Sequence, residues 1–296
     1  MDRRTLLGAL AATPFAGGSA LAASTPAFDP SNSLHTGLAY RKLGWSANDQ
    51  LTFHWLHLIR YGMVDSKLTP MWNILAGSFF RAKDLGEGRY EVTSLSVDFF
   101  TDIESGKLLE TYNNPWTGKT LKVPYKAPKP TTRQHEPTGL KLDGMRVPGK
   151  KVETNVNTKR AWVENGEVFI NGDLDIRMMP DSSAGAAMAA NKSVGARSEG
   201  MGGSTSLVQV NDWFTYSGKA SDVMDPAIKN PPSQMTFNDL NTWSAWLEMD
   251  GHPGNFIGRG FGRKVFKYAD MPASWRQLTE EKYPAIAKDP DGALKG

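Results

Sequence analysis

The sequence contains no cysteine, and only five of its 296 residues are histidine. Without cysteine the protein has no disulfide bond, no thiol nucleophile and no iron–sulfur cluster, and a zinc site would need histidine and carboxylate ligands alone. A chain of this length can bury enough apolar surface to fold without disulfides. Their absence is therefore compatible with export from the cytoplasm.

Strong net charge and standard catalytic motifs are also missing. The formal net charge is +3, and the basic residues are interspersed with acidic ones, so no nucleic-acid partner is predicted. The chain has no phosphate-binding loop, no G-x-S-x-G, no H-E-x-x-H and no dinucleotide-binding fingerprint. The glycine-rich residues 200–203 lack the helix that a phosphate cradle requires. We therefore expect neither a cofactor nor a metal.

Residues 1–22 have the pattern of a signal peptide of the twin-arginine type. Arg3 and Arg4 precede a short apolar run, and Ala20 and Ala22 are small residues of the kind that a signal peptidase recognises. The run is too short to span a bilayer. The paired arginines favour the twin-arginine route over an ordinary secretory signal. The sequence predicts a periplasmic or otherwise exported protein, with no integral membrane segment after signal removal.

The remaining chain divides into a polar, turn-rich entry segment, residues 23–50, and a single β-rich domain, residues 51–296. Two apolar, aromatic runs at residues 51–61 and 71–82 predict a buried strand or a short helix each. Segments rich in β-branched and aromatic residues predict strands at residues 89–102, 108–113, 121–125, 204–217 and 255–268. We expect residues 89–125 to form an antiparallel meander inside one sheet. The glycines of residues 255–268 predict a bend in that strand.

Turn and helix signals complete the expected fold. Asn165-Gly166 predicts a hairpin over residues 159–171. Short helices are expected at residues 239–249 and 272–286. Residues 126–151 read as a surface connection and residues 181–203 as a mobile loop. The whole pattern predicts a mainly β protein, an antiparallel barrel or strongly bent sheet with a few short helices.

Two histidines, His54 and His57, lie three residues apart in the first aromatic segment. On a helix they would share a face and could bind a metal. On a strand they would point to opposite faces, so that only one could face a cavity. Because no carboxylate lies at a useful spacing, we favour either structural roles or acid–base chemistry by one histidine.

The other candidates for a site are aromatic and charged residues. Trp116 lies in the string Asn-Pro-Trp-Thr-Gly at residues 114–118, which is read first as a structural turn and second as a ligand contact. Trp243 and Trp246 are spaced as a core pair, yet a β domain this rich in aromatics also suits an apolar cavity. Arg197 and Glu199 would share one strand face, either as a surface ion pair or inside a cavity.

Four strings together resemble an uncharacterised bacterial family, domain of unknown function 1838. They are Asp-Ile-Glu-Ser-Gly at residues 102–106, Asn-Pro-Trp-Thr-Gly at 114–118, Trp-x-x-Trp with a following Met at 243–249, and Met-Pro…Tyr-Pro at 271–284. The resemblance covers most of the chain after residue 22. It is associated with bacteria that degrade aromatic compounds, and with cofactor-free release of formaldehyde from lignin-derived phenylcoumaran dimers. The family has no agreed catalytic motif, so the resemblance assigns no residue a role.

The resemblance implies a cofactor-independent lyase for a bulky aromatic substrate, working by acid–base chemistry. The alternative is a periplasmic binding or carrier protein for small aromatic or apolar ligands, and the oligomeric state is not predicted. The candidate catalytic residues are His57, Arg60, Tyr61, Arg197 and Glu199. The candidate substrate-binding residues are His54, Trp55, Trp116, Trp213 and Trp246.

Overall fold

The computed structural model describes residues 26–125, 127–137, 139–140, 150–157, 160–180 and 208–295. The predicted signal peptide and the predicted loop at residues 181–203 lie outside the described residues, and so do Arg197 and Glu199. No helix within the described ranges is both long and apolar enough to cross a membrane.

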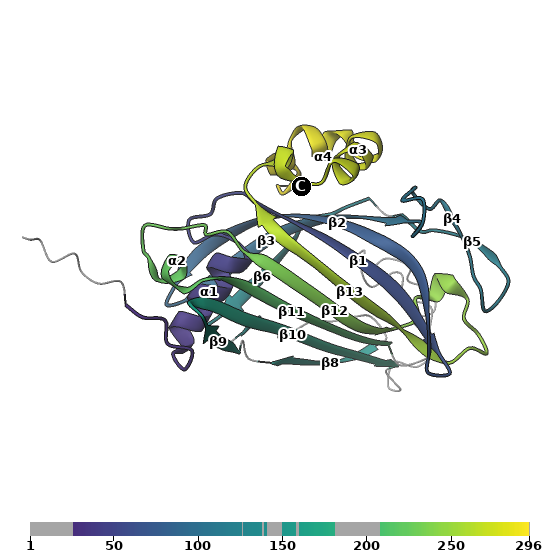
Figure 1. The fold of residues 1–296 in the computed structure, drawn as a ribbon, viewed down its shortest axis with the longest axis horizontal. Coiled ribbons are helices and arrows are strands. Elements are labelled where there is room, and N and C mark those ends of the chain that lie inside the picture. The colour runs from purple at the N-terminus through teal and green to yellow at the C-terminus, as the bar shows by residue number, and fades with distance from the viewer. Residues whose placement is uncertain are drawn as a thin grey trace, which may run out of the picture.

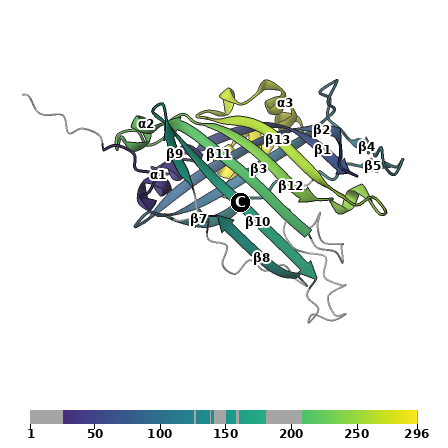
Figure 2. The same ribbon diagram turned by 60° about the horizontal axis from the view of Figure 1, so that its bottom comes forward.

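A single large antiparallel sheet forms most of the described chain, and it curls into a half-barrel (Figure 1). Its strands, in spatial order, are β7 (Gly139–Leu140), β6 (Thr131–Glu136), β3 (Arg89–Thr101), β2 (Lys67–Gly86), β1 (Thr52–Val64), β13 (Gly254–Val265), β12 (Gln234–Thr242), β11 (Val208–Lys219), β10 (Glu167–Pro180) and β8 (Lys150–Asn157), with β9 (Ala161–Glu164) also paired to β10. The two edge strands, β7 and β8, contact each other (Figure 2). The predicted bent, mainly β architecture is thereby confirmed.

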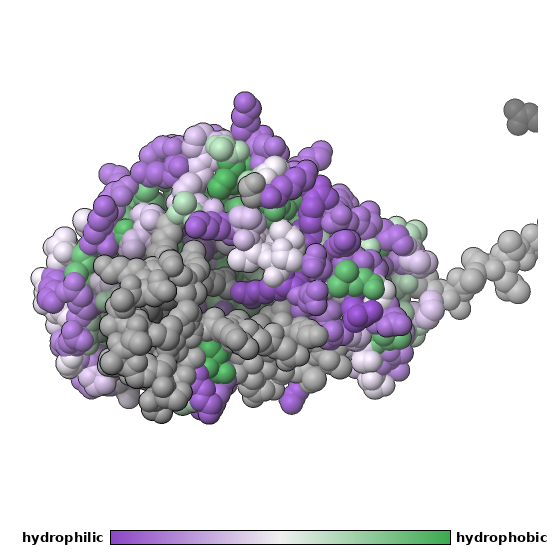
Figure 3. Space-filling model, turned by 180° about the vertical axis from the view of Figure 1, so that it is seen from behind, coloured by the Kyte–Doolittle hydropathy of each residue, from purple (hydrophilic) through white to green (hydrophobic). Residues whose placement is uncertain are grey.

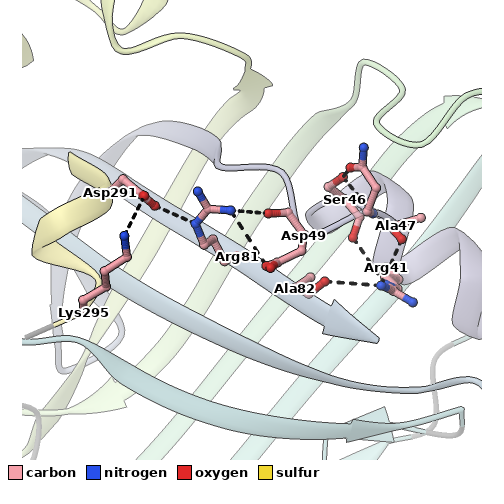
Figure 4. Close-up of polar contacts among 9 residues, drawn as sticks. Arg41, Ser46, Ala47, Asp49, Arg81, Ala82, Asp291 and Lys295 are labelled. Atoms are coloured by element: carbon pink, nitrogen blue, oxygen red, sulfur yellow. Dashed lines mark hydrogen bonds and ion pairs between the residues drawn. The ribbon is translucent and has the colours of Figure 1, made fainter. Parts of the chain in front are cut away.

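The first helix, α1 (Ser33–Gly44), was not anticipated, because its stretch of chain is polar and turn-rich. Asn32 caps it by accepting hydrogen bonds from the first turn, and its Ala39 and Leu43 are fully buried. Basic residues then hold the helix end by donating to backbone carbonyls. Arg41 donates to Ser46, Ala47 and Ala82 and pairs with Asp84, as Figure 4 shows in part. The polar residues that suggested a loose entry segment are therefore part of a helix that packs against the sheet.

The C-terminal helices cover part of the convex face of the sheet (Figure 1). They are α3 (Ala273–Lys282), α4 (Pro284–Lys288) and α5 (Pro290–Ala293). Trp275 is 1% exposed, packs against Phe79, and donates its indole N–H to the Val97 carbonyl at 2.9 Å. Arg81 holds α5 through Asp291 at 2.6 Å (Figure 4). The predicted terminal helix is confirmed, although it breaks into separate turns.

Three more expectations about local structure are wrong. The surface connection expected at residues 126–151 contains strands β6 and β7, which belong to the large sheet. The segment after β3 leaves the large sheet and forms a separate two-stranded sheet, β4 (Thr111–Asn113) with β5 (Thr120–Lys122), so the meander is split. Residues 239–249 continue strand β12 and end in a single 3₁₀ turn, η1 (Ala245–Leu247). Two tryptophans three residues apart occur in helices and in strands, so their spacing alone does not predict a helix. Here the pairing of β12 with β11 and β13 makes the start of this segment a strand. The remaining short helices are α2 (Ala220–Met224) and η2 (Tyr268–Asp270).

Glycines let β13 approach β1 very closely. A Cβ added at Gly262 would lie 1.9 Å from the carbonyl oxygen of Trp55, and one at Gly254 would lie 2.0 Å from that of Met63. No side chain fits there, so the glycines permit the tight curl of the sheet at this point.

Replacing Gly262 by Ala is expected to lower the free energy of unfolding by about 1–3 kcal/mol, because the new methyl group must push two paired strands apart. Urea unfolding measures the effect. Gly44→Ala is the control, since its Cβ meets only Tyr216, at an ordinary 3.9 Å. Equal stability of the two variants would contradict the close approach.

Candidate functional site

The concave face of the sheet is filled at both ends and partly open between them. At one end α1 packs on rings that include Tyr90 and Tyr216, and at the other Trp72 and Tyr112 are buried. Half-buried residues form the middle of this face: Leu56, Ala76, Ser78, Ser96 and Phe214. We refer to the region of these five residues as the central concave face. Figure 3, which views the molecule from behind, shows hydrophilic residues at the rim of a hollow.

An ion pair joins two strands on this face. Arg60 of β1 donates through Nη1 to Asp239 of β12, and their side chains are 13% and 2% exposed. The register aligns Arg60 with Gly258 of β13, and Gly258 with Asp239. A Cβ at residue 258 would lie 2.6 Å from Asp239 Oδ1. The glycine therefore leaves the space through which arginine reaches aspartate across the intervening strand.

A second carboxylate lies beside this pair. Asp212 of β11 is directly opposite Asp239 in the register, so the two side chains share the concave face. Like charges at directly opposite positions are destabilising. We call these three residues the Arg60–Asp239–Asp212 group.

Aromatic rings surround Arg60 at the buried end. Its guanidinium lies over the ring of Phe256, 5.2 Å from the centroid, and Trp72 packs edge-on against the same ring at 5.9 Å. Trp246 contacts Trp72 at 5.7 Å. Trp116 packs against Trp243 and fills the space over Gly62, where a Cβ would meet it at 2.2 Å. Two predicted binding residues, Trp116 and Trp246, thus lie in the cluster that adjoins Arg60.

The two histidines point to opposite faces, as a strand requires. His54 is on the concave side but is 4% exposed, packed edge-on against Phe80 and Tyr216. Burial, together with the nearby Lys264 ammonium, lowers the pKa of His54 to about 3. It is therefore neutral at physiological pH, which suits a packed structural residue better than a general acid.

The remaining candidates lie on the convex face. His57 is opposite the exposed Phe261 in the register, and Trp55 packs against both Phe261 and the Arg263 guanidinium. Tyr61 lies four residues after His57 in β1 and therefore on the same side of the strand. Trp213 is 42% exposed on the convex side of β11. The sheet therefore separates His57, Tyr61, Trp55 and Trp213 from Arg60.

Sequence reasoning missed both aspartates. They occur in the strings Val-Asn-Asp-Trp at residues 210–213 and Phe-Asn-Asp-Leu at 237–240, each inside a strand. A carboxylate in the middle of each strand was the available signal. Within the described ranges, no three His, Cys, Asp or Glu side chains come close enough to hold a metal ion.

The buried neutral His54 makes stability depend on pH. Its folded pKa lies below that of the unfolded chain, about 6.5, so the unfolded state binds the proton first as the pH falls. The free energy of unfolding is expected to drop by about 1.4 kcal/mol per pH unit below pH 6.5 from this group alone, or about 2 kcal/mol by pH 5.

Chemical denaturation at pH 7.5 and pH 5 measures this dependence. In His54→Gln the difference in the free energy of unfolding between pH 7.5 and pH 5 should shrink by about 2 kcal/mol. In the control His252→Gln this difference should not shrink. A difference that is unchanged in His54→Gln would show that His54 is not held neutral.

Comparisons with known proteins add little. No family model matches the chain, and no curated protein matches it. Among solved structures, one similar chain is an N-terminal dehydratase from the difficidin assembly line, 7% identical, with 83% of this chain and 86% of that chain covered. Its TM-score of 0.13 is too low to carry an argument. The resemblance to the family of unknown function stays an expectation.

Proposed function

We propose that the protein is a cofactor-independent lyase that binds a bulky aromatic compound on the central concave face and acts on it by acid–base chemistry. One observation carries the proposal. The Arg60–Asp239–Asp212 group lies between the half-buried middle of that face and an aromatic cluster. A concave, largely apolar surface with a few convergent polar groups is the usual form of a small-molecule site.

The three side chains fit the proton transfers of an aldehyde-releasing cleavage. A carboxylate, Asp212, takes the proton of the side-chain hydroxyl, and the O–H electrons form the carbonyl of formaldehyde. The carbon–carbon electrons form the new alkene, and the benzylic carbon–oxygen bond breaks toward the phenolic oxygen. Arg60, held in place by Asp239, stabilises that oxygen as negative charge develops, before it is protonated.

The choice of a phenylcoumaran as substrate comes from the family resemblance. What supports it on the protein is the aromatic cluster at this end of the face, where the half-buried Trp246, backed by the buried rings of Trp72 and Phe256, would contact an aryl group. One end of such a dimer would then lie against the aromatic rings, and the other end against the Arg60–Asp239–Asp212 group.

A binding or carrier protein is the second candidate, and the histidines favour it. His54 is neutral and packed, and His57 lies on the convex face. Neither of these two histidines therefore offers an acid–base group to the middle of the concave face. A protein with this face could hold an aromatic ligand without changing it.

Assay of the purified protein distinguishes the two. It is incubated, after dialysis and with a chelator, with a phenylcoumaran dimer that has a free side-chain hydroxyl. Stilbene and formaldehyde in equal amounts are expected. The matched control is the same dimer with that hydroxyl methylated, which cannot release formaldehyde by this route. Binding without product would establish the carrier function, and neither binding nor product would refute both.

We also propose that the protein works outside the cytoplasm, on the strength of Arg3, Arg4 and the small residues at 20–22. Protein recovered from the periplasm of an expressing cell should begin near Ala23. Mature protein that still carries Arg3 and Arg4 would contradict this.

A further inference from the structure

Trp72 and Arg60 form adjoining parts of one surface. They are directly opposite in the register of β1 and β2, which places both side chains on the concave face. Both also contact Phe256: the Arg60 guanidinium carbon at 5.2 Å and the Trp72 ring at 5.9 Å. A ligand group that reached one of them would therefore lie beside the other.

The indole N–H of Trp72 has no hydrogen-bond partner among the described residues, although the side chain is only 2% exposed. Its ring neighbours are Phe100, Tyr112, Trp246 and Phe256. Leaving such a donor unsatisfied is costly, and a ligand oxygen would remove that cost. Arg60 adds to this surface, because a guanidinium has five N–H donors and the bond shown to Asp239 uses one.

The charges next to these donors select the kind of oxygen. Asp239 already pairs with Arg60. An anionic carboxylate or phosphate would lie beside the Asp239 carboxylate and be repelled by it, whereas a neutral ether or phenol oxygen would not. The surrounding rings suit an aryl group that carries this oxygen.

We infer that Trp72 is a specificity-determining residue whose indole N–H donates to a neutral ether or phenol oxygen of an aromatic ligand, with Arg60 beside it. The inference rests on the proposed function and narrows its ligand class to neutral oxygen-bearing aromatics. According to this inference, the indole N–H of Trp72 makes the protein prefer a ligand with an oxygen atom at this position over one with a CH₂ group there.

Two probes of nearly the same shape test it, 2-phenyl-2,3-dihydrobenzofuran and 2-phenylindane, which differ by a ring oxygen in place of a CH₂ group. Calorimetry with the full chain is expected to show about tenfold tighter binding of the benzofuran. In Trp72→Phe, which keeps an aromatic ring but lacks the donor, that preference should disappear. Trp246→Phe is the matched control and should retain it, with thermal melts confirming that each variant is folded.

The outcomes separate this inference from the function on which it rests. Equal binding of the two probes by the unaltered protein, or a preference that persists in Trp72→Phe, would overturn the role of Trp72 and leave an aromatic site standing. Failure of the unaltered protein to bind either probe would overturn the aromatic site itself. Because the first comparison uses the unaltered protein, it decides the question even where Trp72→Phe does not fold.

Discussion

Replacing Asp212 by Asn is expected to lower turnover of a phenylcoumaran dimer by about 10²–10⁴, the usual cost of losing one general acid or base. The reason is that Asp212 is the half-buried carboxylate on the central concave face, next to an Asp239 that already pairs with Arg60. Asn keeps the shape of the side chain but cannot accept the proton.

The same variant should keep its fold, because Asn has nearly the same shape as Asp. An aspartate with a purely structural role would instead lower stability when replaced and leave turnover per folded molecule unchanged. Turnover per folded molecule and the thermal melt are therefore measured together.

Asp173→Asn is the matched control. Asp173 is opposite the exposed Trp213 in the register, so it lies on the convex face of the neighbouring strand β10. Its loss should leave turnover unchanged. If Asp212→Asn kept full turnover, or if both variants lost it equally, the assignment of the base to the concave face would be wrong.

Replacing Asp239 by Ala is expected to lower the free energy of unfolding by about 3–5 kcal/mol. The change leaves the Arg60 guanidinium, 13% exposed, without its carboxylate partner on a face rich in rings. An uncompensated buried charge costs more than the lost ion pair itself contributed. Urea unfolding at neutral pH measures the loss.

The double variant Arg60→Met with Asp239→Leu tests the cause. Replacing both members of a buried ion pair by apolar residues of similar volume is often neutral or stabilising, so most of the loss should be recovered. The double variant should nevertheless show no turnover, because it lacks the Arg60 guanidinium that stabilises the developing negative charge. A double variant as unstable as Asp239→Ala would show that the aspartate acts through packing and not through the charge of Arg60.

Local sequence alone determined the class of fold. The β-branched and aromatic runs at residues 71–82, 89–102 and 255–268 form strands, and Asn165-Gly166 forms a hairpin turn. These signals are local: a side chain's preference for an extended backbone, or a residue that tolerates a left-handed turn, acts without the rest of the chain. The glycines of β13 predicted a bend in that strand, and they lie where β13 approaches β1 closely.

Only the tertiary structure decided which residues share a site. Alternation along β1 puts His54 and Arg60 on one face and His57 and Tyr61 on the other, but a single strand does not say which face is concave. That follows from the curl of the whole sheet, with α1 inside and the C-terminal helices outside. Asp239 meets Arg60 although the two lie 179 positions apart in the chain, and Asp212 lies opposite Asp239 in the register. No local pattern contains such contacts, because long-range register is set by how all the strands bury their faces together.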